Sequence, residues 1–190
     1  MKLLLPLVVL FAFLLPSFAQ EAEESRLLPV ADLDGAVSSG QWSQEDGELR
    51  SGAGEAALLT FPQLIPQNYD LEVEFTRVEG TDSIVFVVPV GDVSPALEIS
   101  GWEGESHGLS RVNGLSTNDP GNPISVRPGT IENGRRYLLE VSVRVNGENA
   151  SIQALLGGDG LFTWEGVISS LMPNLVIQVE QPNRLGLSTR

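Results

Sequence analysis

Cysteine is absent from the 190-residue chain. The protein therefore has no disulfide framework, no thiolate chemistry and no cysteine for lipoprotein-type acylation. Its stability must come from a buried apolar core. The roughly 170 residues that follow the N-terminal segment are enough for one ordinary domain with such a core.

Basic residues are scarce. Lys and Arg together number 11, against 25 Asp and Glu, and the formal net charge is −14. Such an acidic surface repels nucleic acid and anionic membranes, so no nucleic-acid partner is expected. His107 is the only histidine, so a histidine metal cluster or a Ser-His-Asp triad would depend on it alone. Asp119 and Asp159 are isolated carboxylates, too few for a calcium site, and we predict no metal or cofactor.

Only the N-terminus carries a long apolar run. In MKLLLPLVVLFAFLLPSFA, Lys2 precedes the run, and Ser17 and Ala19 are the small residues expected before a signal-peptidase site. We predict a cleaved signal peptide over residues 1–19, a mature chain that begins at Gln20, and a secreted or periplasmic location. The run is about a dozen residues long and interrupted by proline, so no membrane insertion is expected after cleavage.

The remaining chain is patterned for strands. Residues 20–29 form an acidic lead-in that we expect to be a flexible tether, and the domain is predicted to span residues 30–190. DLEVEFT (70–76) alternates apolar and acidic residues, which indicates a half-exposed strand. SIVFVVPV (83–90) is apolar at every position from Ile84 to Val88, which favours a strand covered on both faces. ALEIS continues this pattern, and no window has helical periodicity.

A three-stranded antiparallel meander is predicted over residues 137–165. Its first strand should place one set of side chains in the core, namely Leu139, Val141, Val143 and Val145. The alternate residues should face water: Leu138, Glu140, Ser142 and Arg144. Turns are expected at Asn146–Asn149 and at Gly157–Gly160. Trp164 and Trp42 lie in strand patterns, for which a buried role is the simpler interpretation.

Four segments of the chain together resemble a known family. They are WSQEDGEL (42–49), YDLEVEFTR (69–77), NGRRYLLEVSVRV (133–145) and IQALLGGDGLFTWEG (152–166). In order and turn spacing they resemble the concanavalin A-like lectin/glucanase superfamily. More narrowly, they are similar to laminin G-like and 3-keto-disaccharide hydrolase-type domains of secreted bacterial proteins.

The resemblance implies an all-β jelly-roll sandwich of two antiparallel sheets, used by its relatives to bind carbohydrate on the concave face or on edge loops. Relatives usually continue beyond an RLGL segment with one more strand, whereas this chain ends at Arg190. Either the chain is a fragment that lacks its last strand, or one sheet edge is left open. The fold occurs in both lectins and hydrolases, so it does not determine whether this protein is one or the other.

No catalytic residues are assigned. A retaining glycosidase needs two carboxylates about 5 Å apart, and the E-x-D-x-x-E pattern that commonly supplies them on this fold does not occur in the chain. Sugars are bound by aromatic faces together with polar groups that contact their hydroxyls. A predicted loop, GWEGESHGLSRVNG (101–114), with the residues that follow it, offers such groups. The candidate ligand-binding residues are Trp102, Glu103, His107, Arg111, Asn113, Asn118 and Asp119.

Three functions are compatible with this pattern. The first is a secreted, non-catalytic module that binds carbohydrate or another surface, its partner being a glycan or a cell-surface protein. The second is a glycoside hydrolase acting on a modified disaccharide, with Glu103, Glu105 and His107 as acid/base candidates. The third is a structural protein-interaction domain. Alternatively, the loop is simply solvated, with Trp102 packed as its anchor. The sequence does not determine the ligand or the oligomeric state.

Overall fold

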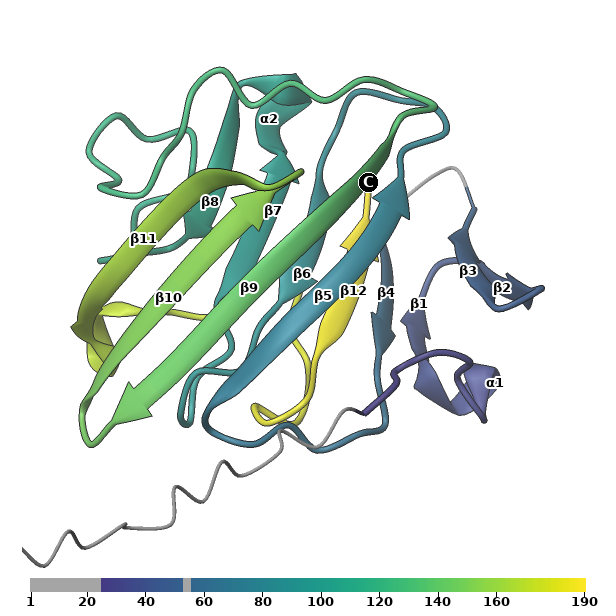
Figure 1. Cartoon of the computed structure of the whole chain (residues 1–190), viewed down its shortest axis with the longest axis horizontal. Coiled ribbons are helices and arrows are strands. Elements are labelled where there is room, and N and C mark those ends of the chain that lie inside the picture. The colour runs from purple at the N-terminus through teal and green to yellow at the C-terminus, as the bar shows by residue number, and fades with distance from the viewer. Residues whose placement is uncertain (1–24, 53–55) are drawn as a thin grey trace, which may run out of the picture.

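A computed structural model describes residues 25–52 and 56–190 (Figure 1). The predicted signal peptide and the first part of the predicted tether lie outside the described residues. Leu27, in the described part of that tether, packs against the core. No helix among the described residues has the length and apolar content that a membrane span requires.

Antiparallel strands build two main sheets and a separate hairpin. The larger sheet has six strands, in the order β1 (Val37–Ser39), β4 (Ala57–Thr60), β12 (Gly186–Thr189), β6 (Ile84–Val87), β7 (Ala96–Ser100) and β8 (Ser106–Ser110). The other sheet has four: β11 (Asp159–Val167), β10 (Asn149–Leu156), β9 (Arg136–Asn146) and β5 (Tyr69–Thr76). The hairpin pairs β2 (Trp42–Glu45) with β3 (Glu48–Ser51). Short helical turns occur at α1 (Leu33–Ala36), α2 (Gly101–Gly104) and the 3-10 turn η1 (Ile168–Ser170).

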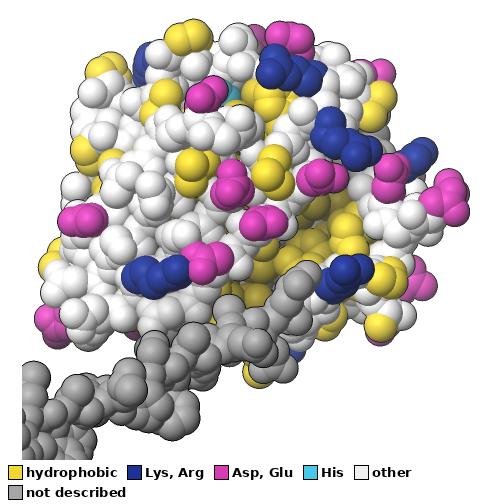
Figure 2. All heavy atoms as spheres, in the orientation of Figure 1, with side chains coloured by type: hydrophobic (Ala, Val, Ile, Leu, Met, Phe, Trp, Pro, Cys, Tyr) yellow, Lys and Arg dark blue, Asp and Glu magenta, His cyan; other side chains and the backbone are white. Residues whose placement is uncertain are grey.

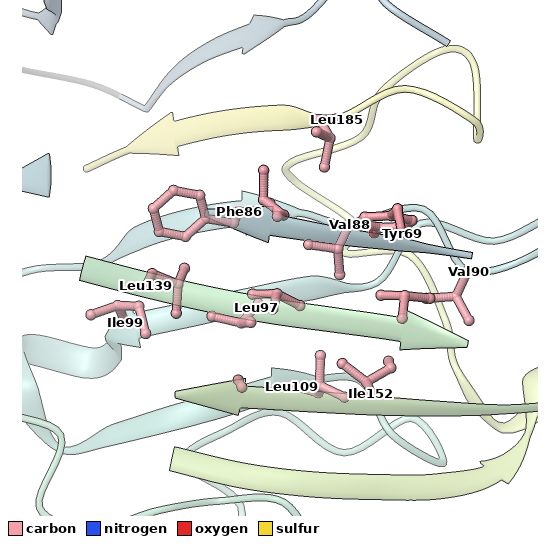
Figure 3. Close-up of a cluster of buried hydrophobic side chains, with 14 of the residues drawn as sticks. Tyr69, Phe86, Val88, Val90, Leu97, Ile99, Leu109, Leu139, Ile152 and Leu185 are labelled. Carbon is pink, nitrogen blue, oxygen red and sulfur yellow. The ribbon is translucent and has the colours of Figure 1, made fainter. Parts of the chain in front are cut away.

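The two main sheets pack face to face, with the four-stranded sheet in front in Figure 1. Side chains from both sheets meet between them, including Phe86, Leu97 and Leu109 from the larger sheet and Leu139 and Ile152 from the smaller (Figure 3). The predicted jelly-roll-like, all-β sandwich of antiparallel sheets is therefore confirmed.

The four-stranded sheet follows the sequence pattern closely. Along β5, Tyr69 and Leu71 are buried while Asp70, Glu72 and Glu74 are exposed. Strand β9 buries Leu139, Val141 and Val143, as the register predicted. The predicted meander is confirmed, because β9, β10 and β11 pair consecutively. Trp164 is buried in β11, and Trp42 packs partly buried against the core.

The six-stranded sheet is covered on both faces. Every residue of β6 and β7 is buried, as the apolar run over β6 predicted. The outer face is covered by part of the connection between η1 and β12: Ile177 packs there against Leu58, Val85, Val87 and Ala96, with Val179 beside them. The continuous apolar sequence of β6 therefore reflects two apolar environments, one on each side of the strand.

Strand β12 lies inside the six-stranded sheet, hydrogen-bonded to β4 on one side and to β6 on the other. The RLGL segment (184–187) leads into this strand. The edges of the sheet are β1 and β8. Pairing with β4, more than a hundred residues earlier in the chain, brings the end of the sequence to the middle of the sheet.

Candidate functional site

Trp102 lies on a tight turn with unusual backbone geometry. Turn α2 joins β7 to β8, and 47% of the Trp102 surface is exposed. Ser100, Trp102 and Glu103 all have left-handed φ values, at 58°, 56° and 59°. For residues other than glycine this conformation costs on the order of 1 kcal/mol each, and such strain concentrates at functional sites. Trp102 is therefore not part of the buried core, and the alternative of a solvated loop with Trp102 packed as its anchor stays a prediction.

The guanidinium of Arg77 holds this turn in place. Nη1 donates to Oγ of Ser100 at 2.7 Å, and Nη2 donates to the carbonyl of Ile131 at 2.7 Å. Nε donates to Oδ1 of Asn133 at 2.6 Å. Nη1 also contacts the carbonyl of Asp82 at 3.3 Å. One side chain thus ties the residue before the turn to the segment that packs beside it. Because a guanidinium is planar with fixed donor directions, the link is rigid.

A second contact fixes the other side of the turn. The Gly129 N–H donates to the carbonyl of Gly104 at 3.1 Å. Gly129 also lies directly against the backbone of Ser106, where a Cβ would come within 2.1 Å of the Ser106 carbonyl carbon. No side chain fits there. The turn is therefore clamped between Arg77 and Gly129.

His107 is not on a loop, contrary to the sequence prediction. It lies in β8, is only 5% exposed, and exchanges two backbone hydrogen bonds of 2.9 Å with Val126. Its Nδ1 accepts from the N–H of Ser100 at 3.1 Å. Burial lowers its pKa to about 4, so the imidazole is neutral at pH 7. The sequence SHGLS does not alternate apolar and polar residues, so the sequence pattern does not predict strand β8.

The three acid/base candidates of the hydrolase hypothesis therefore do not lie together at the surface. Glu103 and Glu105 are exposed, whereas His107 is almost wholly buried with Nδ1 occupied. A general base must reach the proton that it removes. The imidazole instead serves to accept the Ser100 N–H next to the left-handed turn.

Residues 111–131 cover the edge of β8, where Val126 pairs with His107, and Asn122 organises the first half of this segment. Its Nδ2 lies within hydrogen-bond distance of the carbonyls of Leu109, Leu115 and Ser116, at 2.9 to 3.2 Å. Its Oδ1 accepts from the Ile124 N–H at 2.9 Å. Asn122 is 5% exposed. Nothing in the sequence distinguishes this asparagine from its neighbours.

The remaining predicted residues lie in two places, a turn in the segment that follows β8 and the end of β8 itself. Asp119 is used in a turn, where its Oδ1 accepts from the Gly121 N–H at 2.8 Å, and the carbonyl of Asn118 accepts from Arg127. Arg111 and Asn113 follow the far end of β8, about 13 Å along the strand from Ser106. The structure thus leaves Trp102 and Glu103 together and separates them from Arg111 and Asn113.

Glu98 is a buried carboxylate close to the turn. It is 7% exposed and accepts a hydrogen bond from the hydroxyl of Thr117; Nδ2 of Asn174 lies 3.5 Å from its other oxygen. These contacts join β7 to residues 111–131 and to the connection before β12. Within the described ranges, no group of three or more His, Cys, Asp or Glu side chains is placed to hold a metal ion.

The arrangement of the strands has a counterpart among solved structures. The chain is similar to the carbohydrate-binding module CBM66 from Bacillus subtilis, with a TM-score of 0.50, 8% sequence identity, and coverage of 80% of this chain and 85% of that chain. At this identity the likeness supports the fold. No family model matches the sequence, and no curated protein matches it.

Proposed function

We propose that this protein is a secreted or periplasmic, non-catalytic module that binds a glycan through the turn carrying Trp102. The observation that carries the proposal is the exposed indole on a strained and clamped backbone. Because the backbone on either side of Trp102 is held by hydrogen bonds, a ligand that stacks on the indole has to order the side chain but not the turn. The likeness in fold to a carbohydrate-binding module supports the same reading.

The chemistry of the turn suits a sugar. The apolar face of a sugar ring stacks on an aromatic side chain, while charged and amide groups take its hydroxyls. Glu103 and Glu105 lie beside Trp102 and are exposed. We further propose that the fold belongs to the laminin G-like variety of concanavalin A-like sandwiches, in which edge loops bind ligands.

A glycan array followed by titration tests the proposal. We expect the parent protein to bind at least one glycan, with a change in fluorescence from Trp102, the most exposed of the three tryptophans described. Trp102→Ala should weaken binding by about one to two orders of magnitude, while Trp102→Phe, which keeps an aromatic face, should retain much of it. Both variants keep a Cβ at a left-handed position and are therefore matched in backbone strain.

Leu64→Ala serves as the control, since Leu64 is 63% exposed and lies in the connection before β5, at the other end of that strand from Arg77. Its binding should equal that of the parent. A parent that binds no glycan, or a Trp102→Ala variant that folds and binds as tightly as the parent, would refute the proposal. In the second case the ligand contacts another surface, and a protein partner becomes the better hypothesis if glycans fail altogether.

A further inference from the structure

A hollow lies on the outer face of the four-stranded sheet, near the hairpin that joins β9 to β10. The hollow is shallow and open to solvent, with a volume of about 480 Å³. It is lined by Arg144, Asn146, Asn149, Ala150, Ser151, Glu165 and Gly166. The β9–β10 hairpin is at the opposite end of the sandwich from α2 (Figure 1). The hollow is therefore separate from the Trp102 turn.

Strand pairing places the polar side chains of the hollow in two rows. Ser151 pairs with Arg144 on one side and with Glu165 on the other. Asn149 pairs with Asn146 and with Val167, which is 49% exposed. Each row crosses three strands and spans about 10 Å. Such a span suits an oligosaccharide better than a single sugar.

The polar groups of the hollow are available to a ligand. Asn146, Asn149 and Glu165 are exposed and Ser151 is half-buried, so a ligand on this face can reach all four side chains. Together they offer both donors and acceptors, which is what a ring with several hydroxyl groups requires. Exposed Val167 adds an apolar surface for the C–H groups of such a ring.

The charge around the hollow selects against acidic ligands. Nη2 of Arg144 donates to both carboxylate oxygens of Asp70, at 2.7 and 2.8 Å, so these two charges compensate each other. Among the residues that the structure describes, no ion pair includes Glu165, which adds a negative charge to a protein whose formal net charge is −14. Figure 2 shows acidic side chains distributed over this face, with basic side chains scattered among them. An anionic sugar would be repelled.

We infer that this hollow is a second glycan-binding site, which takes a neutral oligosaccharide mainly through hydrogen bonds. The inference rests on the proposed glycan-binding function but not on Trp102. Two sites at opposite ends of one domain would let the protein hold a long polymer, or two chains, with higher avidity than either site alone.

Chemical-shift mapping on the full-length mature protein tests the inference. Maltohexaose, cellohexaose, xylohexaose and mannohexaose are titrated separately, with polygalacturonate as the acidic comparison. We expect at least one neutral oligosaccharide to shift the amide signals of residues 144–151 and 165–166. Asn149→Ala combined with Ser151→Ala should weaken that binding about tenfold or more, through the loss of two hydrogen-bonding side chains. Gln153→Ala, exposed on the next row of the same face, is the matched control and should bind as the parent does.

The outcomes separate this inference from the proposed function. Shifts at residues 101–105 without shifts at the hollow would overturn the second site and leave the Trp102 site standing. Shifts at the hollow that survive in Trp102→Ala would support the second site whether or not the turn binds. Polygalacturonate binding at the hollow more tightly than every neutral oligosaccharide, or no shift at the hollow with any probe, would overturn the inference.

Discussion

The backbone N–H of Ser100 donates a 3.1 Å hydrogen bond to Nδ1 of His107, which ties the left-handed residue before the Trp102 turn to strand β8. An imidazole that accepts at Nδ1 and is neutral carries its proton on Nε2. Since this side chain is buried, the folded protein disfavours its protonation. The contact therefore couples the conformation of the turn to pH.

The first prediction concerns this coupling. Burial lowers the pKa of His107 to about 4, against an ordinary value of 6.5. The unfolded chain therefore takes up a proton as the pH falls through 6.5, while the folded chain does not until near 4. The contribution of neutral His107 to the free energy of unfolding is therefore fully present above pH 6.5 and is lost as the pH falls toward 4. The loss should be on the order of 3 kcal/mol.

Urea unfolding at a series of pH values between 7 and 4 measures this effect. His107→Asn is the matched variant, because its Oδ1 can accept from Ser100 while the side chain does not titrate. Its stability should fall less steeply than that of the parent over this interval. If the two curves run parallel, His107 does not control the pH dependence, and carboxylates account for it.

A second prediction tests the core register. Val143 is completely buried and pairs with Ile152 and Tyr69 on the neighbouring strands. Val143→Asp should bury an unpaired carboxylate between the sheets and cost several kcal/mol, enough to unfold a marginal domain. Gln153→Asp, on the exposed face, should change the free energy of unfolding by less than about 0.5 kcal/mol. Thermal melts of equal midpoint would show that the register is incorrect.

Arg144 is not a neutral control for that experiment, although it faces outward. Its guanidinium is paired with Asp70, and hydrogen bonds from Ser142 and Arg144 lower the pKa of Asp70. Arg144→Asp would put two like charges side by side. A modest loss of stability is expected from this repulsion, even though the residue is exposed.

Much of the fold could be predicted because local pattern and burial agree. Strand β5 alternates with a period of two, and β6 is apolar at every residue because both of its faces are covered. The pairing of β9, β10 and β11 follows from two tight turns. In each case the pattern that predicts the strand lies within one short segment of the sequence.

The rest depends on contacts between distant segments. Strand β8 is polar and short, and it is a strand because β7 and Val126 supply its hydrogen bonds. The position of β12 between β4 and β6 follows from pairing across most of the chain. At the candidate site, the exposure of Trp102 was a sequence-based hypothesis, but the roles of Arg77 and Asn122 arise from carbonyls that only the folded chain brings together.

The third prediction concerns strain in the turn. Glu103 has a φ of 59°, a value at which glycine has no steric penalty. Glu103→Gly should raise the free energy of unfolding by about 0.5–1 kcal/mol, whereas Glu103→Ala, which also removes the carboxylate, should leave it nearly unchanged. Urea midpoints of the two variants give the comparison. Equal midpoints would mean that the turn carries little strain.

The last prediction concerns Arg77, whose guanidinium contacts Ser100, Ile131 and Asn133 at 2.6 to 2.7 Å. Arg77→Lys keeps the charge but loses the planar set of donors, and a single ammonium cannot reach all of these acceptors. We expect a loss of stability of about 1–3 kcal/mol and, at temperatures where the variant remains folded, glycan affinity at the Trp102 turn lowered about tenfold. Titration monitored by tryptophan fluorescence measures the affinity.

Arg50→Lys is the control for this experiment, because the Arg50 side chain is 62% exposed and its only ion pair among the residues described is with exposed Glu48 in the β2–β3 hairpin. It should change neither quantity appreciably. If Arg77→Lys lowers stability but leaves affinity intact, the turn keeps its shape through the close packing of Gly129 against Ser106, and Arg77 acts on the fold alone. If affinity falls as predicted, the indole owes its binding orientation to a guanidinium contributed by the residue immediately after β5.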